Sequence, residues 1–201
     1  MFEFARNKLS VQMKRVAPLA AIWRFVRREE GSSAVEFGLI LLPFIAMMFA
    51  IMETALVFFA DQTLETAVAD SARLIMTGQA QNGGWQPADF KQRVCARIYG
   101  MFTCDSSAFV SSSTSPNVYV NVQTYSTFGG ISYTPPLDRN GNLDSSGFGY
   151  NHGGPGDIVV VQLFYQWPIF VSLMNLGSLS NMAAHSRLLV ATAAFRNEPY
   201  N

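Results

Sequence analysis

Charged residues are scarce in this chain. Lys, Arg, Asp and Glu together make up 14% of its 201 residues, whereas about 25% is usual in soluble domains. The 14 basic and 14 acidic residues balance to a formal net charge of zero, so no basic excess indicates nucleic-acid binding. With 49% apolar residues, the chain is expected to place part of its length out of water. The length allows one folded domain with an appendage and argues against a two-domain enzyme.

Residues that commonly build catalytic and metal sites are also few. The chain has two histidines and two cysteines, with no CxxC redox motif and no clustered zinc ligands. It has neither a Gly-rich phosphate loop before a predicted helix nor a GxSxG elbow. Residues 138–144 place oxygen ligands at alternate positions, but Leu143 and Gly149 stand where a calcium loop needs glycine and glutamate. We therefore expect no enzyme activity, no cofactor and no metal site.

One long apolar run is present. From Phe37 to Ala60 the sequence reads FGLILLPFIAMMFAIMETALVFFA, 24 residues with a single charge, Glu53. As a helix this run covers about 36 Å, enough to cross a hydrocarbon core of about 30 Å. The alternatives are a buried helix of a soluble protein and a secretory signal peptide. The run is longer than the apolar part of a signal peptide, and no small-x-small cleavage site follows it, so we expect a retained membrane anchor.

Basic residues are concentrated before this run. Seven precede it with only Glu3 opposing them in the first 28 positions, whereas the thirty residues after it contain one basic residue, Arg73. The seven are Arg6, Lys8, Lys14, Arg15, Arg24, Arg27 and Arg28. This asymmetry predicts that the N-terminus stays in the cytoplasm and that the C-terminal part is exported.

The junction between the basic leader and the apolar run has a distinctive pattern. Gly31 is followed five residues later by Glu36, at the start of the expected membrane helix. A carboxylate in hydrocarbon costs several kcal/mol unless it finds a partner. Glu36 is therefore expected either to lie in the headgroup layer or to pair with a positive group.

This junction resembles the cleavage site of type IV prepilins and pseudopilins. The resemblance implies that a membrane prepilin peptidase cuts between Gly31 and Ser32 on the cytoplasmic side, which makes Glu36 the fifth residue of the mature chain. The new ammonium of one subunit could then pair with the Glu36 carboxylate of its neighbour and set the register of assembly. Phe37 stands where the major Flp pilins have tyrosine, so aromatic character is kept.

The resemblance narrows to TadE-like pseudopilins of the tight-adherence (Flp/Tad) pilus system. It rests on Gly31 to Pro43, on Glu53, on residues 62–73, and on the ending Phe195-Arg-Asn-Glu-Pro-Tyr200. It implies a minor pilin-like subunit whose partners are other pilins and pseudopilins, the inner-membrane assembly platform and the lipid bilayer. Pro43 favours a kink, and Glu53 lies about 25 Å beyond Glu36 along the helix, either reaching headgroups or touching a co-assembling helix.

The exported part begins with a continuation of the helix to about residue 77. Leu64, Val68 and Ile75 form an apolar stripe for packing on the domain or on a partner. A second helix is predicted from Pro87 to about Tyr99. Cys95 and Cys104 should pair in an oxidising periplasm and contribute roughly 2–3 kcal/mol.

Strand patterns follow the second helix. Valines alternate with polar residues from 118 to 123, and further strands are predicted at 158–167 and 186–195. The fold class is therefore α+β: a long N-terminal transmembrane helix continues into a stalk and packs on a small antiparallel sheet with one further helix. The expected parts are a cleaved leader (1–31), a membrane helix (32–60), a stalk helix (61–80) and a periplasmic domain (81–201). Residues 129–156 are expected to form a contact loop or a disordered connection.

Two functions remain open from the sequence. The first is a minor pseudopilin in the bacterial inner membrane, with its C-terminal domain in the periplasm or incorporated into a pilus. The second is an uncut, single-pass periplasmic enzyme or sensor. The N-terminus of the mature protein distinguishes them, because only the pseudopilin should begin at Ser32.

Overall fold

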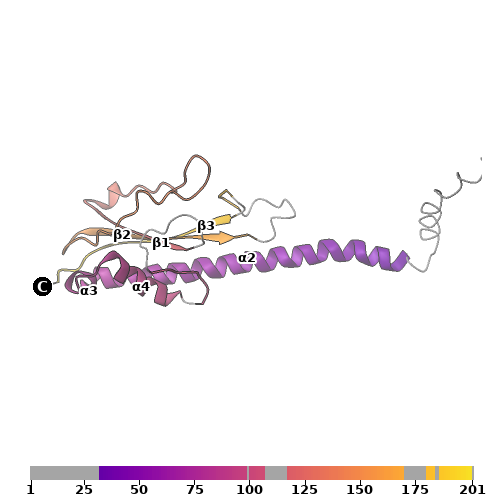
Figure 1. Ribbon diagram of the computed structural model, residues 1–201, viewed down its shortest axis with the longest axis horizontal. Helices are drawn as coiled ribbons and strands as arrows, with labels where there is room; N and C mark the ends of the chain where they lie inside the picture. The colour runs from indigo at the N-terminus through magenta and orange to yellow at the C-terminus, as the bar shows by residue number, and fades with distance from the viewer. Residues whose placement is uncertain (1–31, 99, 107–116, 170–179, 184–185, 201) are drawn as a thin grey trace, which may run out of the picture. The chain divides into compact units, whose positions relative to one another are not determined.

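The computed structural model describes residues 32–98, 100–106, 117–169, 180–183 and 186–200 (Figure 1). Within these ranges the chain has the predicted α+β fold, with one long helix, further short helices and a three-stranded sheet. The chain divides into two compact units, residues 1–49 and residues 50–201, which are described in turn.

The described part of the first unit is the beginning of helix α2. This helix spans Ser32–Met76 as one element of 45 residues and contains Pro43 without interruption. Up to residue 49 its large apolar side chains are mostly exposed, among them Leu39, Ile40 and Leu42. The segment is thus helical by its own backbone hydrogen bonds while presenting apolar surface on all sides, which is the pattern of a helix that spans a membrane.

The second unit is built on a sheet in the order β1-β2-β3. Its strands are β1 (Val118–Tyr125), β2 (Ile158–Pro168) and β3 (Ser186–Arg196), and both pairings are antiparallel. The register places Val118 opposite Tyr165, and Leu163 opposite Ala191. The strand positions agree with those predicted from the alternation of apolar and polar residues.

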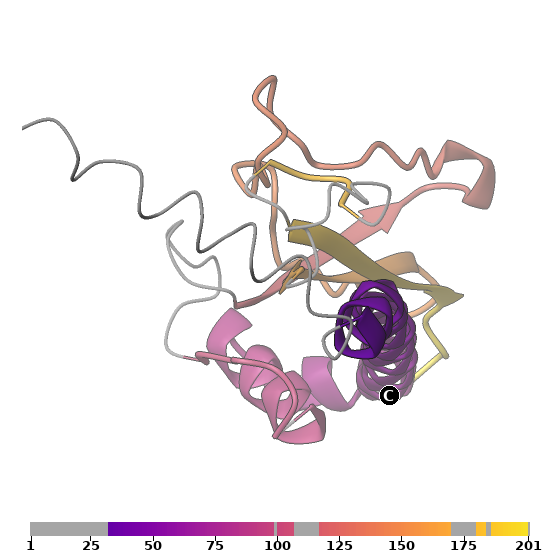
Figure 2. The same ribbon diagram turned by 90° about the vertical axis from the view of Figure 1, so that its right-hand side faces the viewer.

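Helices cover one face of this sheet. Figure 2 shows α2 and α4 (Pro87–Arg97) on the same side, and the short α3 (Gln79–Asn82) connects them in the chain. Helix α4 begins at Pro87, and the side chains of Gln86 and Asp89 close a capping box around its first turn. The core between helices and sheet contains the predicted stripe of α2, in which Leu64, Val68 and Ile75 are buried.

The other face of the sheet is covered by the segment between β1 and β2. Phe148 stacks on Phe164 at 4.8 Å between ring centroids, and Leu137 and Leu143 pack on the same small core. Backbone bonds from Val122 to Gly149 and from Asn151 to Val122 attach this segment to the outer edge of β1. The segment also includes the short 3-10 helix η2 (Phe128–Gly130). Residues 129–156 are therefore an integral layer of the domain.

Candidate functional site

The candidate functional site is the exposed apolar surface of α2. Among the described residues, α2 is the one helix that is both long enough and apolar enough to cross a membrane. None of its most apolar 18-residue stretch is buried within the chain. Covering so much apolar surface requires either lipid or other helices, because monomeric soluble proteins rarely expose contiguous apolar patches of this size. The site thus fits hydrophobic association and anchoring.

The residues predicted at the start of this helix are placed as follows. Gly31 and the rest of the leader lie outside the described residues, and Ser32 is the first residue of α2. Glu36 and Phe37 lie in the first two turns and are exposed, and Pro43 lies exposed two turns further on. An exposed carboxylate therefore stands at the beginning of the apolar surface.

Glu53 has a different environment. Its side chain is 6% exposed and lies in the second unit, one turn before Val57, the first buried apolar residue of the domain core along α2. This burial leaves little surface for the contact with a co-assembling helix that the resemblance implies. Sequence reasoning missed it, although the spacing offered a signal: the i, i+4, i+7 stripe of buried positions in α2 extends back from Leu64 through Val57 to Glu53.

The same region carries the likeness to known proteins. Residues 31–73 match the TadE-like protein family. The chain contains a TadE-like domain. Comparisons with curated proteins and with solved structures gave no match. TadE-like proteins are pilin-like proteins associated with the Tad pilus, and they are not enzymes.

The TadE-like match contains the residues singled out along α2. Ser32, Glu36, Phe37, Pro43 and Glu53 all fall within it, and so does the buried stripe up to Ala72. The sheet and the disulfide lie outside the match. The matched segment therefore contains the exposed apolar surface of α2 and the buried stripe, and the remaining chain supplies the domain that packs against its C-terminal part.

The two cysteines form the predicted disulfide. Cys95 in the last turns of α4 is joined to Cys104, and their Cα atoms are 5.5 Å apart. The bridge fixes the segment after α4 beside Phe102, whose ring meets Tyr165 edge-on at 4.8 Å. It therefore has a structural environment, in which it ties the end of α4 to the sheet.

In the segment that resembles a calcium loop, residues 138–144, the Asp138 carboxylate forms hydrogen bonds within the same segment. One oxygen of Asp138 accepts the backbone N–H groups of Asn140 and Asn142, and these bonds, chiefly that of Asn142, hold the pKa of Asp138 below its usual value. In the part of the chain that the structure describes, no three His, Cys, Asp or Glu residues gather as a metal site. Asp138 thus closes a tight turn.

A second buried charged residue, besides Glu53, was not anticipated from the sequence. Lys91 in α4 lies fully inside the domain, and burial lowers the pKa of its ammonium group while the Asp105 carboxylate acts in the opposite direction. On a helical wheel, Lys91 is adjacent to the apolar positions Phe90 and Val94, which is the only sequence signal for its burial.

Proposed function

We propose that this protein is a minor pilin-like subunit that assists assembly of a Flp/Tad-type pilus. The observation that carries the proposal is the TadE-like match over a helix whose apolar side chains are exposed and whose first turns contain Glu36. On this proposal the protein is held in the bacterial inner membrane by α2, with its N-terminus in the cytoplasm and its domain in the periplasm. Its partners are other pilins and pseudopilins, the assembly platform and the bilayer.

A prepilin peptidase is proposed to cut the chain between Gly31 and Ser32. The basic leader before Gly31 would hold this bond at the cytoplasmic face, beside the start of α2. Replacing Gly31 with Leu should leave the precursor uncut, whereas the matched change Gly38→Leu, within the helix, should not affect cleavage. The measurement is the mass of the membrane-inserted protein. Normal processing of Gly31→Leu would overturn the peptidase step.

Glu36 is proposed to pair with the new N-terminal ammonium of a neighbouring subunit. In an apolar bundle each of these charges needs the other. Removing one leaves the other buried without a partner, at a cost of about 3–5 kcal/mol. Glu36→Ala keeps the anchor and removes a charge from the entrance of the helix, so insertion should be unaffected. Assembly should instead fall severely.

The test of this pairing uses a strain that lacks the native copy. Glu36→Ala is compared with Glu65→Ala, which removes an exposed glutamate further along α2, beyond the apolar run. Processed, inserted protein is confirmed by mass, and co-purification with other pilus subunits and the number of surface pili are then measured. The proposal expects both to fall for Glu36→Ala alone. Wild-type values for Glu36→Ala would show that this carboxylate only faces headgroups.

A further inference from the structure

The domain begins on α2 before the apolar run has ended. On one side of the helix Glu53 is 6% exposed, Val57 is buried, and every later position of the stripe belongs to the core. On the opposite side of the same two turns, Leu56, Phe58 and Phe59 are 51%, 71% and 60% exposed. These two turns therefore carry the folded domain on one side and bare apolar surface on the other.

The open side of α2 changes from apolar to polar directly after these residues. Beyond Phe59 its exposed positions are Gln62, Glu65, Thr66, Ala69, Asp70 and Arg73. A boundary this sharp marks where a helix surface leaves a hydrocarbon environment and enters water. The exposed patch is also continuous in sequence with the apolar run that starts at Phe37, so lipid around that run would extend over the patch as well.

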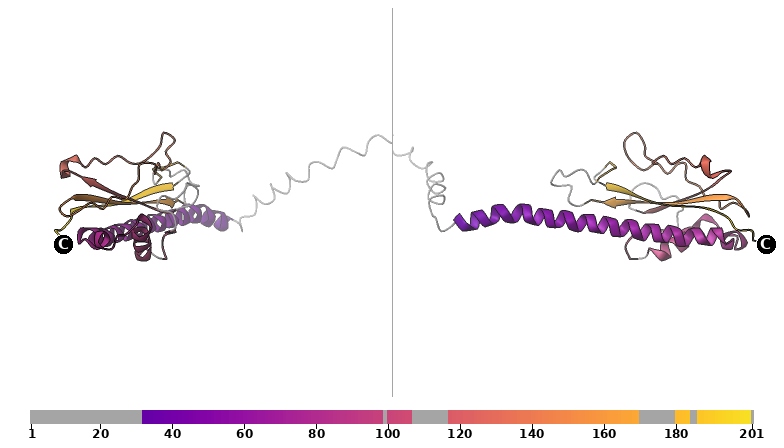
Figure 3. Two further views of the ribbon diagram at one scale, coloured as in Figure 1. Left: turned by 60° about the vertical axis from the view of Figure 1, so that its left-hand side comes forward. Right: turned by 180° about the vertical axis from the view of Figure 1, so that it is seen from behind.

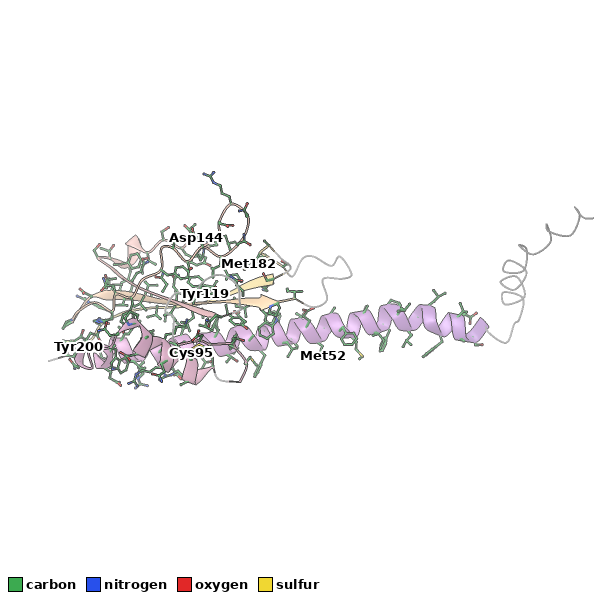
Figure 4. All side chains as sticks on the ribbon, viewed as in Figure 1. Met52, Cys95, Tyr119, Asp144, Met182 and Tyr200 are labelled. Carbon is green, nitrogen blue, oxygen red and sulfur yellow. A yellow bond between two sulfur atoms is a disulfide. The ribbon has the colours of Figure 1, made fainter. Side chains whose placement is uncertain are left out.

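The direction of β3 shows which end of the sheet lies beside Glu53 on α2. Glu198, just after β3, donates its backbone N–H to Met76 at the end of α2 over 2.9 Å, so β3 and α2 finish together (Figure 3). Arg187 lies eleven residues before Glu198, which is about 36 Å back along the strand. A helix covers the same length in about 24 residues, and counting these back from Met76 leads to the level of Glu53. Arg187 and its β2 partner Trp167 are therefore level with Glu53. Figure 4 shows Met52 on α2 close to the same end of the sheet as Met182.

We propose that this end of the domain is immersed in the headgroup layer of the bilayer. Phe59 and Glu53 are six residues apart on α2, about 9 Å, which matches the roughly 5–10 Å to which interfacial protein surfaces sink. Leu56, Phe58 and Phe59 then face acyl chains on the open side while Glu53 stays enclosed by protein. Trp167 and Arg187 are residue types that suit headgroup depth, since both combine an apolar body with a polar end. The proposal rests on anchoring by α2 and is independent of pilus assembly.

The experiment compares two tryptophans at opposite ends of the domain. Trp167 and Trp85 are both half-buried, but Trp85 donates its backbone N–H to Ala80 in α3, beyond the far end of α2. One variant of the full chain keeps only Trp167 (Trp23→Phe, Trp85→Phe), and the other keeps only Trp85 (Trp23→Phe, Trp167→Phe). Each is reconstituted into phosphatidylcholine vesicles with and without bromine on the acyl chains near the headgroup, which quenches tryptophan at that depth.

The proposal expects brominated lipid to quench Trp167 severalfold more than Trp85. Phe59→Asn in the variant that keeps Trp167 should reduce this quenching, because a polar amide on the open side disfavours immersion. Thr66→Asn, one heptad further along the same face, should leave it unchanged. Flotation of the vesicles establishes anchoring independently, so failure of anchoring is not confused with failure of immersion.

Equal and weak quenching of both tryptophans in anchored protein would overturn the proposal. Quenching of Trp167 that disappears as the protein-to-lipid ratio is raised would also overturn it, because a neighbouring subunit and not lipid would then be the stable cover of Leu56 and Phe59. Circular dichroism of each variant confirms that the fold is retained before quenching is compared.

Discussion

At the scale of single residues, Gly78 is a position where a side chain would have no room. It follows α2 with φ of +75°, and a Cβ there would overlap the ring of Tyr200. No local pattern in the sequence predicts that the C-terminal residues contact the end of α2. The structure shows that the last residues return to the end of α2 and that Tyr200 closes over Gly78.

This contact predicts that Gly78→Ala destabilises the domain more than Gly84→Ala. Both glycines have positive φ, for which any other residue costs about 1–2 kcal/mol. A Cβ at Gly84 meets nothing within 4 Å, whereas one at Gly78 must displace Tyr200. Thermal unfolding of the two variants measures the difference. Equal losses of stability would show that the packing of Tyr200 contributes nothing.

Tyr150 provides a test by pH. Burial, with a smaller contribution from the Asp89 carboxylate, raises its pKa to about 12. A raised pKa means that the folded state holds this proton more tightly than the unfolded state does. The stabilisation is complete below pH 10 and is lost between about pH 10 and 12. Tyr150→Phe should remove this part of the alkaline loss, measured as the free energy of unfolding against pH. An unchanged alkaline profile in Tyr150→Phe would contradict the assignment.

At the scale of elements, the disulfide between α4 and the following segment is expected to contribute to the stability of the domain. Closing a loop of this size is expected to stabilise the folded state by about 2–3 kcal/mol. Replacing both Cys95 and Cys104 with Ser should lower the unfolding free energy by this amount. Reductant should lower the stability of the wild-type protein similarly and leave the variant unaffected. A reductant effect that persists in the variant would mean that the bridge is not its source.

The elements themselves were largely predictable, and their long-range contacts were not. The alternating valines of β1 and Pro87 at the start of α4 are local signals, and both located their elements correctly. Residues 129–156 have no periodic pattern from which their structure could be predicted. Phe148 in this segment is held by stacking on Phe164 of β2, and such a contact between separate segments leaves no local signal in the sequence. The burial of Glu53 could not be predicted from the sequence either. A charge within an apolar run suggests an interface, and only the tertiary structure shows that the domain of the same chain encloses it.

At the scale of the whole molecule, the topology of the chain is the main prediction. The basic leader and the single apolar span predict that the C-terminus is exported. Alkaline phosphatase fused after Asn201 should therefore be active, because this reporter folds only outside the cytoplasm. A fusion after Arg28, before the apolar run, is the inactive control. A stable but inactive fusion after Asn201 would reverse the orientation.

The parallel course of α2 and β3 has a mechanical consequence. Leu64, Val68 and Ile75 follow one another along the helix and all pack into the same core beneath the sheet. A pull along the axis of α2 loads these contacts simultaneously, in shear, so the helix cannot be peeled from the sheet one turn at a time. The bond between Glu198 and Met76 adds a tie at the far end. A force that pulls α2 along its axis is therefore transmitted to the whole folded domain at once.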